Sequence, residues 1–180
     1  MESTKQDGRI DIPDSAVSVS SKTASPERVY AALADLNRHS VWGSTNAQKK
    51  NYGLTSISAP AGTAEVGTEF SSTGIDPMGT FADHSVVTEA TRPMLFEYVT
   101  EGHLKPKKSG KPGSDTTITH RYEIKESGEG CTVTYRSHIS RWTNAPRIMT
   151  ARLMRPVVKA AMTSTTKRSL RSLIASADQR

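Results

Sequence analysis

Apolar residues recur along the chain with two different periods, and the change of period separates expected strands from expected helices. Residues 15–22 (SAVSVSSK) alternate, with Val17 and Val19 on one side, which is the pattern of a half-buried strand. Ser25 followed by Pro26 then predicts a helix start, because the hydroxyl can accept a free amide hydrogen and proline fits the first helical turn. A strand followed by a helix is the first predicted unit.

The predicted helix after Ser25 has its apolar residues three and four positions apart, as one buried helical face requires. Asp35, Asn37 and Ser40 end this pattern. The Val41-Trp42 pair is expected to close one end of the core from a second short helix. The apolar positions of the first helix are Val29, Tyr30, Leu33, Ala34 and Leu36.

Strand patterns dominate the middle of the chain. Two weaker segments, around 49–57 and 68–73, are separated by an Ala-, Pro- and Gly-rich loop at 58–67 that we expect to be mobile. Phe70 is the expected inward residue of this part. Together with the two hairpins that follow, these segments predict a six-stranded meander.

The first hairpin is predicted over residues 80–100, around a tight Thr-Arg-Pro turn. A pairing that sets Val86 opposite Tyr98, and His84 opposite Thr100, places all four on the inner face. This register agrees with the polarity of the chain, because it leaves acidic side chains in water. The residues on the water face are Glu89, Glu97 and Glu101.

The second hairpin surrounds a turn signal at Ser127-Gly128 and has the most regular alternation. Its predicted register sets His120 opposite Tyr135, and Tyr122 opposite Val133. A histidine and two tyrosines are thus expected on the concave face among apolar neighbours, where their polar tips need partners. The inward positions are Ile118, His120, Tyr122, Ile124, Cys131, Val133, Tyr135 and Ser137.

The longest periodic segment predicts a helix over Pro146–Ala177. A bend is expected near residues 152–156, because Pro156 removes a backbone hydrogen bond. A long helix laid across a curved sheet leaves a cavity beneath it. Its apolar positions are Met154, Val157, Val158, Ala161, Met162 and Thr165, then Leu170, Leu173 and Ile174.

Composition limits the architecture to one core. A chain of 180 residues with 34% hydrophobic content supports one folded domain, expected over 15–178, with a flexible polar arm at 1–14. No segment has the length of apolar sequence that a membrane span needs, and the first residues show no secretion signal, so we expect a cytoplasmic, soluble protein. Cys131 is the single cysteine, which excludes an internal disulfide, and we expect it to be a small core residue.

Positive charge is concentrated in the C-terminal part. The net charge is +6, and residues 141–180 contain nine Lys or Arg against one acid. Attraction to phosphate is one interpretation, and a solvated helix face is the other. We favour the second, because no aromatic residues alternate with the basic ones to stack bases. We expect no nucleic-acid partner, no stable membrane insertion, at most weak contact with an anionic surface, and a monomer or homodimer.

Catalytic motifs are missing from the sequence. It has no Gly-x-Ser-x-Gly elbow and no glycine-rich phosphate loop, which sets aside hydrolase, kinase and dinucleotide functions. His84 and His120 have no convergent carboxylate, so we expect no metal and no cofactor. His120 beside Tyr135 is an acid/base candidate able to polarise a carbonyl or move a proton. A structural histidine held by a hydroxyl is the favoured alternative.

Four segments carry a resemblance to a known family: SVSSKTASPERVYAALADLNRHSVW at 18–42, VGTEF at 66–70, VVTEATRPMLFEY at 86–98 and RLMRPVVKAAMTSTTKRSLRSLI at 152–174. With their order of elements, they resemble the START-like, helix-grip superfamily, whose bacterial members are called polyketide cyclase/dehydrase and lipid-transport (SRPBCC) proteins. The resemblance implies an α+β fold in which a curved antiparallel sheet of about seven strands surrounds a long C-terminal helix. It also implies a hydrophobic tunnel for sterols, lipids, polyketides or aromatic hormones, although several inward Ser and Thr residues depart from a purely lipid pocket.

The expected function is binding of a small hydrophobic ligand between the sheet and the C-terminal helix. The alternative is a polyketide cyclase or dehydratase that uses the same cavity, with His120 and Tyr135 as the catalytic candidates. An adaptor whose basic helix meets a partner or a membrane is a third possibility. The expected ligand-binding residues are Phe70, His84, Val86, Phe96, Tyr98, Ile118, His120, Tyr122, Val133, Tyr135, Met154, Val158, Ala161 and Met162.

Overall fold

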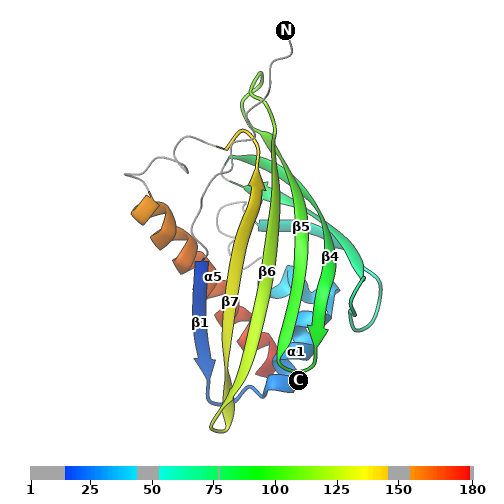
Figure 1. Cartoon of the computed structure of the whole chain (residues 1–180), viewed down its shortest axis with the longest axis vertical. Helices are drawn as coiled ribbons and strands as arrows, with labels where there is room; N and C mark the ends of the chain where they lie inside the picture. The colour runs from blue at the N-terminus through cyan, green and yellow to red at the C-terminus, as the bar shows by residue number, and fades with distance from the viewer. Residues whose placement is uncertain (1–14, 44–52, 77, 146–154, 179–180) are drawn as a thin grey trace.

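A curved, seven-stranded antiparallel sheet with a long C-terminal helix on its concave side forms the fold (Figure 1). The computed structural model describes residues 15–43, 53–76, 78–145 and 155–178. The strand order is β1-β7-β6-β5-β4-β3-β2, so the first strand closes one edge beside the last. The strands are β1 Ser15–Ser21, β2 Gly53–Ser58, β3 Glu69–Asp76, β4 Gly79–Thr91, β5 Leu95–Pro106, β6 Ser114–Ser127 and β7 Gly130–Trp142. The helix-grip fold expected from the sequence is confirmed.

The helices between β1 and β2 begin as predicted. The Ser25 hydroxyl accepts a hydrogen bond from the Arg28 amide, and Pro26 opens helix α1 (Pro26–Ala34). A short 3-10 turn, η1 (Leu36–Arg38), leads into helix α2 (His39–Gly43). Trp42 of α2 is buried as expected, whereas Val41 is 58% exposed and lies outside the core.

Helix α5 (Arg155–Asp178) packs through its second half only. Leu170 and Leu173 are almost fully buried, and the helix lies against α1, α2 and β1. Its first half extends away from these helices (Figure 1), and Val157 and Met162 are exposed there. None of the described helices is long and apolar enough to cross a membrane. The predicted arm at 1–14, the start of the helix at Pro146 and the bend that precedes Pro156 lie outside the described residues.

The predicted register of the first hairpin is wrong by two residues next to the turn, where Ala90 pairs with Phe96, and by one residue on the other side of Thr88. Val87, rather than Val86, pairs with Tyr98, because a β-bulge at Thr88 inserts one extra residue into β4. Since side chains alternate along a strand, this shift exchanges the two faces of β4 below the bulge. The inward residues are therefore Phe81, Asp83, Ser85 and Val87.

The predicted register of the second hairpin is wrong by two residues, which preserves both faces. Tyr122 pairs with Tyr135, and His120 pairs with Ser137. The turn consists of Gly128 and the residue after it, since Ser127 pairs with Gly130. A shift of two leaves every side chain on its expected side, so the histidine and both tyrosines still face the concave side.

Candidate functional site

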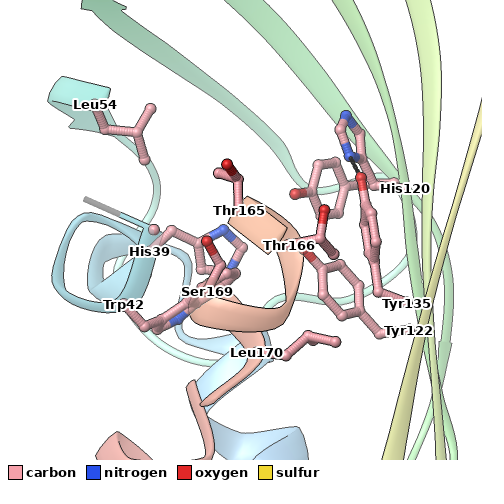
Figure 2. A pocket seen from close by; sticks show the side chains of 12 residues that line it. His39, Trp42, Leu54, His120, Tyr122, Tyr135, Thr165, Thr166, Ser169 and Leu170 are labelled. Carbon is pink, nitrogen blue, oxygen red and sulfur yellow. Dashed lines mark hydrogen bonds between the residues drawn. The ribbon is translucent and has the colours of Figure 1, made fainter. Parts of the chain in front are cut away.

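A hollow of about 230 Å³ lies between the concave face of the sheet, α2 and the middle of α5 (Figure 2). We call it the histidine pocket. Aromatic and imidazole rings form two of its walls, and small hydroxyl side chains of α5 lie between them. Its lining residues are His39, Trp42, Gly43, Leu54, Tyr98, His120, Tyr122, Tyr135, Thr165, Thr166, Ser169 and Leu170.

His120 and Tyr135 form the hydrogen bond drawn in Figure 2. The Nδ1 atom of His120 is 2.7 Å from the Tyr135 hydroxyl oxygen. The imidazole also stacks on Tyr98, with ring centroids 4.7 Å apart. The ring is thus held by one polar and one aromatic contact, and its Nε2 atom remains for a ligand.

His39 is a pocket residue that the sequence reasoning missed. Its Nε2 atom is 2.7 Å from the carbonyl oxygen of Leu33, so Nε2 carries the proton and donates. The ring is buried and lies against Trp42, with centroids 4.5 Å apart. A single polar residue at the start of a five-residue helix leaves no periodic signal, and only the tertiary packing identifies it.

Burial keeps these groups uncharged near neutral pH. Desolvation lowers the pKa of both His39 and His120 to about 4. It raises the pKa of Tyr98 to about 12 and also raises that of Tyr135. The pocket therefore offers neutral imidazoles and protonated phenols, which recognise polar atoms by hydrogen bonds without supplying a charge.

Trp42 lines the hollow with its ring, but its indole N–H is not accessible from it. The Nε1 atom is buried and has no hydrogen-bond partner among the described residues. An unmatched buried N–H of this kind costs about 1–3 kcal/mol.

A second hollow, of about 280 Å³, lies further along the concave face under the first half of α5. We call it the tryptophan pocket. Ile118, Ile139 and Trp142 form its floor, and Met162 of α5 lines it as well. The indole N–H of Trp142 donates to the Ser114 hydroxyl at 2.7 Å, which fixes the ring at this position.

One row of side chains crosses the sheet at this end. By the strand register, Asp83 lies next to Gly102, which lies next to Thr116, which in turn pairs with Trp142. The Asp83 side chain is half-buried, and its desolvation raises the pKa to about 6. The sequence reasoning missed Asp83 because the predicted register put it on the water face.

The structure brings together only some of the predicted ligand-binding residues. Tyr98, His120, Tyr122 and Tyr135 line the histidine pocket, and Ile118 and Met162 line the tryptophan pocket. Phe70, Phe96 and Val133 are buried core residues that line neither pocket, and Ala161 is exposed. Met154 lies outside the described residues, as does the side chain of Val158.

His84 and Val86 are placed on the wrong face by the sequence reasoning. The His84 side chain is 51% exposed and lies 3.6 Å from the carboxylate of Glu69 on the convex side. The bulge at Thr88 is the cause, because it reverses the alternation of β4. Neither residue can contact a ligand on the concave face.

No group of three or more His, Cys, Asp or Glu within the described ranges is arranged to hold a metal ion. Cys131 is fully buried, and burial raises the pKa of its thiol, which makes the thiolate scarce. Apart from hydrogen bonding, the groups available for chemistry in the histidine pocket are therefore the two imidazoles and the phenols.

Comparison with known proteins finds one family and many structures. Residues 14–177 match the family described as "Polyketide cyclase / dehydrase and lipid transport". No curated protein matches the chain in sequence. Among solved structures, a conserved protein from Geobacillus kaustophilus is 13% identical, with a TM-score of 0.65, and the match covers 93% of this chain and 96% of that one.

Two further structures show the same fold at similar distance. Protein CV1439 from Chromobacterium violaceum is 14% identical with a TM-score of 0.60, and the match covers 92% of this chain and 96% of that one. The di-domain ARO/CYC StfQ from the steffimycin biosynthetic pathway is 12% identical with a TM-score of 0.61, and the match covers 93% of this chain and 51% of that protein. At these identities the likeness establishes the fold alone.

Proposed function

Because the chain belongs to the polyketide cyclase/dehydrase and lipid transport family, we propose that it binds a small, mostly apolar molecule on the concave face of its sheet. The observation that carries the proposal is the histidine pocket, where rings from the sheet and from α2 surround a hollow roofed by α5. Rings supply apolar contact area, and their polar tips fix the orientation of a ligand.

The size and polarity of the pocket support a ligand of one or two rings, or the end of a longer molecule. Its volume of about 230 Å³ lies below the range of about 300–1,000 Å³ that drug-sized ligands occupy. His120 lines the hollow and uses only its Nδ1 atom in the hydrogen bond to Tyr135, so its Nε2 atom favours a ligand that carries an oxygen atom. We infer an aromatic or alicyclic molecule with at least one carbonyl or hydroxyl group.

The His120–Tyr135 contact favours a second candidate function, a cyclase or dehydratase. In the tautomer whose Nδ1 atom accepts a hydrogen bond from the Tyr135 hydroxyl, Nε2–H is a donor that can polarise a substrate carbonyl. In the other tautomer Nε2 is unprotonated, and the pKa of about 4 keeps the ring uncharged at neutral pH. In an aldol-type ring closure this Nε2 can take the proton from the carbon that attacks and return it to the oxygen of the attacked carbonyl, so one imidazole serves in turn as base and acid.

Binding can be tested with a matched pair of variants on α5. Thr166 lines the histidine pocket, whereas its neighbour Lys167 is exposed. With 2-(2-naphthyl)ethanol as probe, we expect Thr166→Trp to raise the Kd at least ten-fold and Lys167→Trp to change it less than two-fold. Native mass spectrometry of the protein purified from its own host would then identify the bound molecule. Equal affinity of both variants for the probe would contradict the proposal.

Catalysis is separated from binding by a substitution at His120. In the cyclase or dehydratase function, His120→Ala abolishes turnover of a poly-β-keto thioester probe while the Kd of the naphthyl probe changes less than five-fold. If the unmodified protein shows no turnover and His120→Ala weakens binding of the naphthyl probe, only the binder function is supported.

A further inference from the structure

We propose that Asp83 and Thr116 form an anchor for a protonated amine, so that the ligand of the concave face is a cationic amphipathic molecule. This inference rests on the proposed function, because it specifies the chemical class of the molecule bound there. It concerns a part of the face that the histidine pocket does not include.

The first argument is the geometry around Gly102. A Cβ atom at this position would lie 2.7 Å from Oδ1 of Asp83 and 2.8 Å from Oγ1 of Thr116. The carboxylate and the hydroxyl therefore converge from two flanking strands above a residue that has no side chain. Both oxygen atoms lie within reach of one donor group placed between them. An ammonium group has three donors and can bond to both.

The second argument is that Asp83 has no partner. Within the described ranges it makes no hydrogen bond and no ion pair. Desolvation by the surrounding protein raises the pKa of its carboxyl group to about 6. At pH 7.5 most of the molecules still carry the charge. A half-buried carboxylate without a cation is partly desolvated, and a positive group or several donors would offset that cost.

The third argument is the aromatic surroundings of this row. Trp142 lies two strands away from Gly102 in the same row, and its ring lines the tryptophan pocket. Tyr98 is close enough for the charge of Asp83 to raise its pKa. Aromatic faces attract cations, and they do so more strongly where water is displaced. A carboxylate at one end of the row and an indole at the other match an amine attached to an apolar body.

A neutral hydroxyl group would satisfy Asp83 less well. It offers one donor for two acceptors and leaves the charge of the carboxylate uncompensated, whereas an ammonium group supplies donors and charge together. The anchor should therefore discriminate between ligands that share a ring system but differ in this group.

The experiment uses three probes with one ring system: 2-(2-naphthyl)ethylamine, 2-(2-naphthyl)ethanol and 2-naphthylacetate. Their Kd values are measured by calorimetry at pH 7.5 for the full chain, Asp83→Asn and the control Glu101→Gln, which removes a negative charge from the exposed convex side. We expect the unmodified chain to bind the amine at least ten-fold more tightly than the alcohol, and the acid most weakly. Asp83→Asn should weaken amine binding at least ten-fold and change alcohol binding less than three-fold. Glu101→Gln should change neither by more than two-fold.

Gly102→Ala provides a second, independent variant. Its methyl group occupies the space between the two oxygen atoms, so amine binding should weaken while the circular dichroism spectrum stays unchanged. Equal binding of amine and alcohol by the unmodified chain, or unchanged amine binding by Asp83→Asn, would overturn the inference. If the alcohol still binds and depends on Thr166, the proposed function survives that result. Failure of all three probes to bind would overturn both.

Discussion

His120 and Tyr135 share a hydrogen bond of 2.7 Å although they are not opposite each other in the sheet. His120 is paired with Ser137, and Tyr135 with Tyr122, so the contact runs diagonally between β6 and β7. Long side chains on one face can span this diagonal. The polar tips of two strands therefore meet at one point of the concave face.

A double-mutant cycle measures this contact. We expect His120→Phe and Tyr135→Phe to lower the free energy of unfolding non-additively, with a coupling of about 0.5–1.5 kcal/mol, because a neutral hydrogen bond contributes about that much. Urea denaturation of the four proteins gives the value. Strict additivity would mean that the contact does not form in solution.

The assignment of the β4 faces can be tested at two neighbouring residues. The Ser85 hydroxyl lies 2.9 Å from that of Thr100, and both are buried. We expect Ser85→Ala to lower the free energy of unfolding by about 1–2 kcal/mol, since it leaves the Thr100 hydroxyl without this partner. His84→Ala should change it by less than about 0.5 kcal/mol, because His84 is exposed. A larger effect at His84 than at Ser85 would contradict the observed faces of β4 and support the register expected from the sequence.

Acid should destabilise the protein through His39. Its pKa is about 4 in the folded state and about 6.5 in the unfolded chain, so between these values the unfolded state binds more protons. The free energy of unfolding then falls as pH decreases from 7 to 4, by about 3 kcal/mol from this residue. His120 acts in the same direction.

Comparison with His39→Gln isolates this contribution. The variant loses a titrating group, so its stability should depend less steeply on pH between 6.5 and 4 in guanidinium titrations. Parallel slopes for the two proteins would show that His39 is already accessible to protons in the folded state.

Removing the charge of Asp83 should stabilise the ligand-free protein. Its folded pKa of about 6 lies above the unfolded value of about 3.9, so the free energy of unfolding falls as the pH rises between these two values, and the penalty is complete above pH 6. We expect Asp83→Asn to raise the free energy of unfolding by about 1–2 kcal/mol at pH 8 and by much less at pH 4.5. Thermal unfolding at both pH values measures the difference. Destabilisation at pH 8 would indicate a bound cation near the carboxylate.

The sequence predicts the fold better than it predicts the site, and single residues explain the difference. The Ser25-Pro26 start of α1 and the alternation of β6 follow from local rules, and the structure confirms both. The bulge at Thr88 has no local signal, because Thr is a β-branched residue of the kind that is enriched in regular strands. The sequence reasoning therefore expected His84 and Val86 where the chain has Asp83, Ser85 and Val87.

Tertiary packing explains the other differences. His39 joins the pocket only because α2 folds against the sheet, and no spacing in the sequence connects it with His120. The second hairpin tolerated an error of two residues because an even shift preserves the faces, whereas an odd one does not. Whether a strand residue is assigned to the correct face thus depends on whether the register error is an even or an odd number of residues, more than on the size of the error.

The bulge at Thr88 also has a consequence for how such a protein can change during evolution. Thr88 is the one residue between the pairs Val87–Tyr98 and Glu89–Glu97, so loss of its codon would restore a regular ladder with every other side chain of β4 on its present face. The bulge is therefore a point at which this strand could lose one residue without changing what the concave face presents to a ligand.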